Sequence, residues 1–136
     1  MARHVVSPPE LAQLVEATGF SPAVRAGDFL FLTGATGGDA DGVMPPDIAT
    51  QVQNALGKAL HIIDAAGGNA DSIVEITSYH IGLKYHFDPV DHIMREMLGL
   101  PLPAWTAVEV ADLRRDGALI EFRIVAHLPP AKPAPK

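Results

Sequence analysis

The sequence contains no cysteine among its 136 residues. Disulfides, thiolate metal sites and thiol nucleophiles are therefore excluded within this chain. It also contains no run of roughly 18 consecutive apolar residues, the length that would indicate a membrane-spanning helix. The opening residues Met1 to Pro8 lack the long apolar segment of a secretory signal. These absences predict a soluble, cytoplasmic protein without a membrane partner.

Basic and aromatic residues are scarce. The formal net charge is −6 and only 6% of the residues are aromatic. Arg114 and Arg115 are the only two cations that follow one another directly. Proteins that bind nucleic acids normally carry a basic stripe, so the sequence predicts no nucleic-acid partner.

Apolar residues make up 48% of the chain, which suffices for a hydrophobic core in a single domain. We place this domain at residues 1–128. Residues 129–136 are half proline and show no periodic pattern, so we expect a disordered, proline-rich tail there.

Two helices are predicted in the first half of the chain. A short one begins at Pro8-Pro9 and ends at Thr18, before Gly19. A long one follows Asp47 as its N-cap, carries apolar residues at helical spacing over residues 48–66, and ends at Gly67-Gly68.

A third helix is predicted to begin at Asp88-Pro89, with aspartate as N-cap and proline in the first helical position. It is expected to end at Gly99. Its apolar face is expected to contain Val90, Ile93, Met94, Met97 and Leu98.

The strands are predicted from β-branched, aromatic and alternating segments. A hairpin covers residues 23–32, a single strand covers 73–81, and a last hairpin joins 105–110 to 118–128 through the turn at 114–117. Residues 35–46 are rich in glycine and acidic residues, and we expect a flexible surface loop there that borders a site. The fold class is therefore α+β, with two helices covering one face of a five- or six-stranded sheet.

The sheet face turned away from the helices is predicted to carry polar and charged side chains. Alternation places Ile120 and Phe122 on one face of the last strand and Glu121 and Arg123 on the other. In the preceding strand, alternation groups Trp105, Ala107 and Glu109, which we assign to the same face as Glu121. Such a face either meets solvent or packs against another copy of the chain.

Several segments, taken in order, resemble the Rid family of reactive intermediate deaminases, also called the YjgF or liver perchloric-acid-soluble protein family. The matching segments are Phe20–Gly34, Gln51–Leu56, Ala65–Gly68, Pro103–Ala111 and Gly117–Glu121. The resemblance covers nearly the whole chain. It implies a chorismate-mutase-like fold and a homotrimer with ligand clefts between subunits.

The resemblance also implies a chemistry, because active deaminases of this family hydrolyse enamines and imines derived from amino acids. An arginine in a Pro-Ala-Arg motif holds the substrate carboxylate, and a glutamate on the last strand activates water. Here Trp105 stands at the arginine position and Arg123 at the position of the catalytic glutamate. Phe20 stands where the family has a tyrosine, and Asp91 where it has an asparagine. The family's small hydroxyl residue before the glycine is kept, as Thr33 before Gly34.

These departures leave two functional hypotheses. One is a divergent family member that binds a small metabolite between subunits, with a carboxylate-bearing compound as the candidate, and converts it by enamine or imine hydrolysis, hydration or tautomerisation. The other is a non-catalytic binding or regulatory protein. The catalytic candidates are Glu121 and Thr33. The ligand-binding candidates are Trp105, Arg123, Phe20, Thr33, Ala107 and Asp91.

Each candidate also has a structural interpretation. Arg123 can form a salt bridge between subunits with Glu121 or Glu109, Trp105 can pack in an interface, and the Asp91 carboxylate can favour a helix dipole. The ribonuclease activity attached to the family name is disfavoured by the acidic charge. The spacing of His80, His86 and His92 matches no familiar ligand motif, so we expect neither a metal nor another cofactor.

Overall fold

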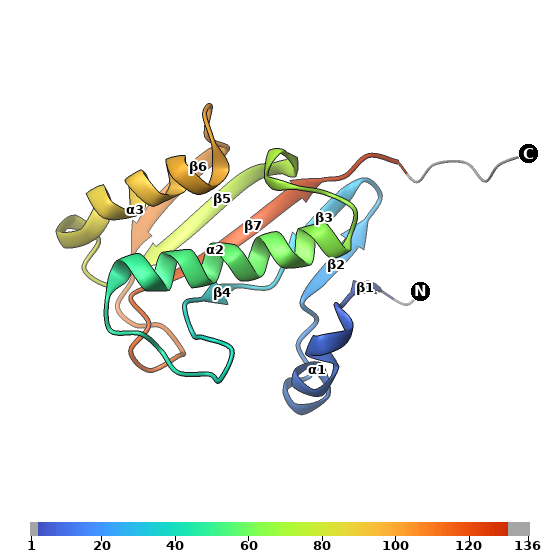
Figure 1. Cartoon of the computed structure of the whole chain (residues 1–136), viewed down its shortest axis with the longest axis horizontal. Coiled ribbons are helices and arrows are strands. Elements are labelled where there is room, and N and C mark those ends of the chain that lie inside the picture. The colour runs from blue at the N-terminus through green and yellow to red at the C-terminus, as the bar shows by residue number, and fades with distance from the viewer. Residues whose placement is uncertain (1–2, 131–136) are drawn as a thin grey trace, which may run out of the picture.

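The computed structural model describes residues 3–130 and forms an α+β fold with one mixed sheet (Figure 1). Helices α2 and α3 lie side by side on one face of the sheet, and the short α1 lies apart from them. Among the residues described, no helix is both long and apolar enough to cross a membrane.

The N-terminal segment contains one strand that the sequence did not indicate. Strand β1 (His4–Val6) pairs with β2 (Ala23–Ala26), and β2 forms the predicted hairpin with β3 (Phe29–Leu32). Between β1 and β2, the 3₁₀ turn η1 (Pro9–Leu11) leads into α1 (Ala12–Thr18). Gly19 ends α1 with φ of 74°, a left-handed conformation that glycine adopts readily.

The long helix α2 (Ile48–Ala65) is the predicted one. Its N-cap Asp47 accepts a hydrogen bond from the Thr50 amide at 2.9 Å. Gln51 is fully buried on the inner side of α2. Its amide nitrogen donates to the carbonyls of Pro45 and Gly117, and its oxygen accepts from the Leu119 amide. One side chain therefore joins α2 to two loops.

The glycine-rich segment after β3 packs more tightly than predicted. A two-residue strand, β4 (Ala35–Thr36), pairs with β7, and Thr36, Gly37 and Gly38 are buried. The Gly37 carbonyl accepts a hydrogen bond from Asn54 of α2 at 3.0 Å. The prediction of a flexible surface loop is wrong for these residues because the absence of side chains lets this backbone lie directly on α2.

Helix α3 (Leu83–Leu98) begins earlier than predicted, after the 3₁₀ turn η2 (Ala70–Ser72) and strand β5 (Ile73–His80). The start at Asp88-Pro89 is wrong, because Pro89 lies inside the helix. The carboxylate of Glu109 accepts a hydrogen bond from the Leu83 amide at 3.0 Å. A residue distant in sequence thus satisfies a free amide of the first turn.

The last two strands, β6 (Ala104–Glu109) and β7 (Ile120–His127), do not form the predicted hairpin. The order of the sheet is β1-β2-β3-β7-β5-β6, with β4 also beside β7. Because α3 crosses over the sheet, β6 returns parallel to β5 at the edge. Strand β7 lies between β3 and β5, antiparallel to both.

The core lies between the sheet and the two long helices. Ile120, Phe122, Ile124 and Ala126 of β7 are almost completely buried there, which confirms the predicted alternation of this strand. Of the predicted tail, residues 131–136 lie outside the described residues. The carbonyl of Pro129 accepts a hydrogen bond from Arg25 at 3.2 Å.

Candidate functional site

Two adjoining hollows meet at Gly34 and Glu121. The first, which we call the α1 pocket, has a volume of about 400 Å³ and is bounded by α1, the β3–β4 segment, the outer side of α2 and Arg114-Arg115. The second, the sheet-face hollow, has a volume of about 380 Å³. It is lined by Leu32, Gly34, Tyr79, Val110, Asp112, Leu113, Glu121 and Arg123.

Glu121 is held close to the backbone where β3 gives way to β4. A Cβ added at Gly34 would come within 2.5 Å of the Glu121 Oε2 atom. Any larger residue at position 34 would therefore displace the carboxylate. Because Glu121 lines both hollows, its carboxylate can act on a ligand in either of them.

Thr33 and Phe20 lie in the α1 pocket, on the same side as Glu121. The Thr33 hydroxyl donates to the Ser21 carbonyl at 2.5 Å, so its oxygen remains free only to accept. The Arg114 guanidinium lies over the Phe20 ring, 5.3 Å from its centroid. Phe20 thereby positions a cation at the entrance of the pocket.

Arg123 is exposed and lines the sheet-face hollow, two residues from Glu121 on β7. Its register partner on β5 is Thr77, and that of Glu121 is Tyr79. Among residues 3–130 no carboxylate lies within salt-bridge distance of Arg123. The predicted polar face therefore exists on β7, with a cation and a carboxylate side by side.

Trp105 lies on the opposite face from Arg123, so its predicted assignment is wrong. Its register partner is Ile76, whose side chain is buried in the core. The indole stacks on Phe87 of α3, with centroids 5.3 Å apart, and donates to the Ser78 hydroxyl at 2.7 Å. Alternation grouped the residues of β6 correctly but could not show which group faces the helices.

Ala107 and Glu109 accompany Trp105 under α3, since their register partners Ser78 and His80 are both buried. Asp91 also belongs to this side of the molecule. It lies in the middle of α3 rather than in its first turn, and its carboxylate accepts from Arg95 at 3.1 Å. The predicted interaction of the Asp91 carboxylate with the helix dipole is therefore wrong, because it depended on a helix start at Asp88-Pro89.

A buried polar chain continues from Trp105 through Ser78 to two histidines. His80 contacts the Ser78 hydroxyl at 2.6 Å through Nε2 and His86 at 3.1 Å through Nδ1. The indole N–H donates to the Ser78 oxygen, which leaves the Ser78 hydrogen free to donate to His80 Nε2. In the His80 tautomer that accepts this hydrogen, Nδ1–H donates to His86. Burial and the neighbouring His86 lower the pKa of His80 to about 4, so both rings are neutral near pH 7.

The three histidines singled out in the sequence do not all come together. Within residues 3–130 no group of three or more His, Asp or Glu side chains is placed to hold a metal ion. His92 lies apart from the other two histidines and pairs with Glu96 on the exposed side of α3.

Sequence reasoning missed Lys58 and His61 of α2 as pocket residues, and it treated Arg114-Arg115 only as a turn. Lys58 and His61 occupy the polar side of an amphipathic helix, which usually meets solvent. The two adjacent arginines were the available signal. The surface formed by Lys58, His61 and the two arginines becomes a pocket because α1 lies beside it.

The chain matches a known family and solved structures. A model of the family described as endoribonuclease L-PSP matches residues 11–128. The RutC family protein YjgH of Escherichia coli is 33% identical over 128 residues, which cover 93% of this chain and 96% of that protein. A RutC family protein of Pyrococcus horikoshii is 31% identical, covering 79% and 86%.

Solved structures share the fold. A structure of protein YjgH superposes with a TM-score of 0.85 at 32% identity and covers 95% of this chain and 98% of its own. Rv2704 from Mycobacterium tuberculosis, described as a member of the highly conserved YjgF family, gives a TM-score of 0.77 at 27% identity. The superposition covers 93% of this chain and all of that one.

Proposed function

Because the chain belongs to the endoribonuclease L-PSP family, which is the Rid or YjgF family, we propose that it forms a homotrimer with ligand clefts between subunits. The clefts bind a small carboxylate-bearing metabolite. The reaction is hydrolysis of an enamine or imine, or a related hydration or tautomerisation. Members of this family act on reactive enamine and imine intermediates.

The observation that carries this proposal is the pairing of Glu121 with Arg123 along one hollow. The Arg123 guanidinium binds the ligand carboxylate through two charge-assisted hydrogen bonds. The Glu121 carboxylate accepts a proton from the water that attacks the C=N carbon. Thr33 supplies an acceptor oxygen at the edge of the adjoining pocket.

The proposed trimer is supported by the open face of the sheet. Val5, Phe29, Phe31 and Val108 are each at least 36% exposed, and the strand registers place them around Arg123 on the face away from α2 and α3. Trp105, Ala107 and Asp91 lie on the other side of the sheet, so a cleft containing all the candidate residues needs a second copy.

A charge placed on this open face is expected to break the assembly. Phe31 is 42% exposed on the sheet face, and Phe31→Asp would bury an unpaired carboxylate between copies. Sedimentation velocity should show a trimer for the native chain and a monomer for the variant. The control Tyr85→Asp changes a side chain that is 94% exposed on α3 and should leave the trimer intact.

A native chain that sediments as a monomer, or a Phe31→Asp variant that stays trimeric, contradicts the proposed interface. Loss of the trimer in both variants would point to a general effect of added charge.

Turnover is expected to depend on Arg123. Imines generated from amino acids by an oxidase are supplied together with cyclic and unsaturated enamines. Hydrolysis of the acyclic compounds is followed by ammonia assay, and hydrolysis of the cyclic enamines, which keep their nitrogen in the ring-opened product, is followed by loss of substrate absorbance. Arg123→Ala should lower kcat/KM at least about tenfold, because a hydrogen bond to a charged group is worth about 1.5–3 kcal/mol. Lys84→Ala, an exposed cation on α3, is the matched control.

The proposal is abandoned if none of these compounds turns over and Arg123→Ala leaves ligand affinity unchanged. Equal activities of Arg123→Ala and Lys84→Ala would also contradict the proposal.

A non-catalytic binding protein is the second candidate. It is favoured by Trp105, whose indole is held by Phe87 and Ser78 at the position where the resemblance implies a carboxylate-binding arginine. Saturable ligand binding without turnover supports this function. Turnover that disappears in Arg123→Ala excludes it.

A further inference from the structure

The α1 pocket combines an apolar wall with a cationic rim. Leu14 and Val15 of α1, Ile62 of α2 and the Phe20 ring supply hydrocarbon surface. A volume of about 400 Å³ falls within the range of small-molecule sites. The pocket therefore suits a ligand that is largely apolar.

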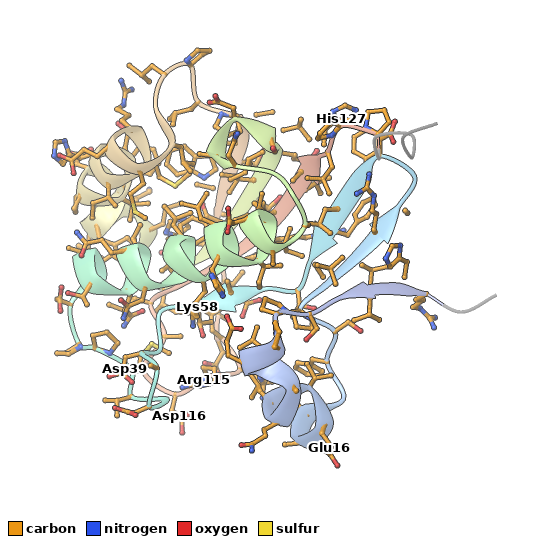
Figure 2. All side chains as sticks on the ribbon, turned by 45° about the vertical axis from the view of Figure 1, so that its right-hand side comes forward. Glu16, Asp39, Lys58, Arg115, Asp116 and His127 are labelled. Carbon is orange, nitrogen blue, oxygen red and sulfur yellow. The ribbon has the colours of Figure 1, made fainter. Side chains whose placement is uncertain are left out.

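Among residues 3–130, three of the eight lysines and arginines line this one pocket. Lys58 projects from α2 and Arg115 from the connection between β6 and β7 (Figure 2). Arg114 precedes Arg115 in the same connection and also lines the pocket. Within residues 3–130, none of the three has a carboxylate within salt-bridge distance. Arg115 donates instead to the Gly42 carbonyl at 2.9 Å.

The charge of Arg115 acts on the Lys58 ammonium. Burial lowers the pKa of the Lys58 ammonium, the charge of Arg115 lowers it further, and Asp39 opposes both. An anion bound between the two cations would relieve this repulsion. The rim therefore suits a negatively charged group.

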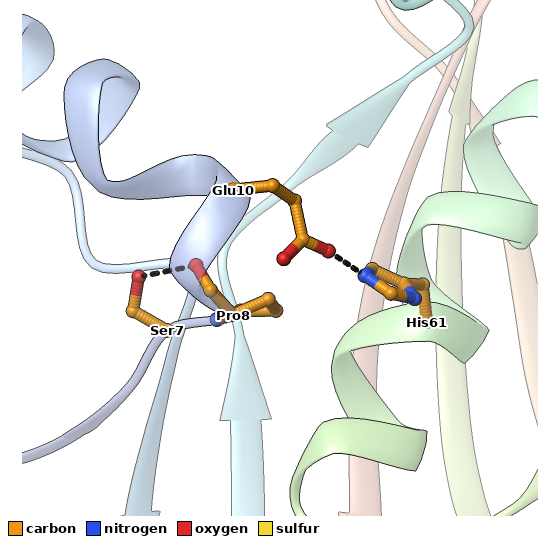
Figure 3. Close-up of polar contacts among 4 residues, drawn as sticks. All are labelled: Ser7, Pro8, Glu10 and His61. Carbon is orange, nitrogen blue, oxygen red and sulfur yellow. Dashed lines mark hydrogen bonds and ion pairs between the residues drawn. The ribbon is translucent and has the colours of Figure 1, made fainter.

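Helix α1 covers the pocket with few attachments of its own. None of its residues is buried, and Leu14 is 58% exposed. The Glu10 carboxylate, just before α1, pairs with His61 of α2 across the pocket edge (Figure 3). The hydrocarbon side of α1 is thus available to a ligand rather than committed to the core.

We propose that the α1 pocket is a binding site for a small apolar monocarboxylate. The carboxylate is bound at Lys58, Arg114 and Arg115, and the hydrocarbon chain lies against α1 and Ile62. This site adjoins the cleft of the proposed function and shares Glu121, Thr33 and Phe20 with it, but its cations are not Arg123 and binding requires no turnover. Glu121 also lines the pocket, and its negative charge directs the ligand carboxylate toward the cations.

The test is calorimetric titration of the native chain with the straight-chain acids butyrate, hexanoate and octanoate. Each added methylene is expected to strengthen binding about threefold to fourfold. Hexan-1-ol and hexylamine, which lack the carboxylate, should bind at least about tenfold more weakly than hexanoate.

The double variant Lys58→Gln, Arg114→Gln should bind hexanoate at least about tenfold more weakly while keeping its affinity for hexan-1-ol. Neither side chain belongs to the hydrophobic core, so the fold should be kept. Lys84→Gln, an exposed cation on α3, is the matched control. Leu14→Ser should weaken octanoate more than butyrate, because it shortens the apolar wall.

The site is refuted if hexanoate and hexan-1-ol bind equally, if affinity does not rise with chain length, or if the double variant binds hexanoate like the native chain. Arg123→Ala separates the two proposals. Under the proposed function it should lower kcat/KM at least about tenfold, and it should leave hexanoate binding unchanged.

Discussion

Gly37→Ala is expected to lower the free energy of unfolding by about 3 kcal/mol, at the upper end of the usual cost of overpacking. A Cβ at this position would come within 2.4 Å of the Gln51 Cα atom and 2.6 Å of its carbonyl oxygen. These are backbone atoms of α2, so no side-chain rotation can relieve the clash. Urea denaturation of the native and variant chains measures the loss.

Gly57→Ala on the same helix is the matched control and should have the opposite sign. A Cβ there would have no neighbour within 4 Å, and alanine is a better helix former than glycine. We expect a gain of about 0.5–1 kcal/mol. If Gly37→Ala and Gly57→Ala change the free energy of unfolding by the same amount and in the same direction, close packing of Gly37 on α2 does not stabilise the fold.

Acidification from pH 7 to pH 5 is expected to remove about 2 kcal/mol of unfolding free energy through His80 alone. Its pKa is about 4 in the folded chain against 6.5 for a free histidine, so the unfolded chain binds the proton first. Stability from this group is therefore complete above pH 6.5 and is lost as pH falls toward 4. His86, whose pKa burial also lowers despite the opposing Glu109, acts in the same direction.

Urea denaturation at several pH values tests this dependence. His80→Gln keeps an amide that can hydrogen-bond to Ser78 and His86, and its stability should vary less between pH 7 and pH 5 than that of the native chain. His92→Gln, at an exposed position on α3, should retain the native dependence. If the free energy of unfolding of His80→Gln depends on pH as steeply as that of the native chain, His80 is not the group that titrates.

Features that depend on short-range sequence could be predicted. Asp47 caps α2 as expected, because an N-cap needs only a side-chain oxygen two or three residues before a free amide. The alternation of β7 could be predicted because its inward set is uniformly apolar. Glu121 and Arg123 therefore appear together on the outer face.

Features that depend on distant partners could not be predicted. Asp88-Pro89 carries a strong local signal for a helix start, yet Glu109 allows α3 to begin at Leu83. Trp105 and Thr106 point to opposite faces of the sheet, whichever strand pairs with β6. Only the parallel pairing of β6 with β5 shows which of the two lies under α3.

The sequence by itself determined the family resemblance, the periodicity of the main elements and the polar outer face of β7, since each follows from residues close together in the chain. The tertiary structure alone decided which strands pair, which face Trp105 occupies and that Lys58 and Arg115 meet beside α1. The physical reason is that strand pairing and pocket formation depend on the packing of segments distant in sequence. No local pattern encodes the partner across a sheet or the helix that closes a pocket.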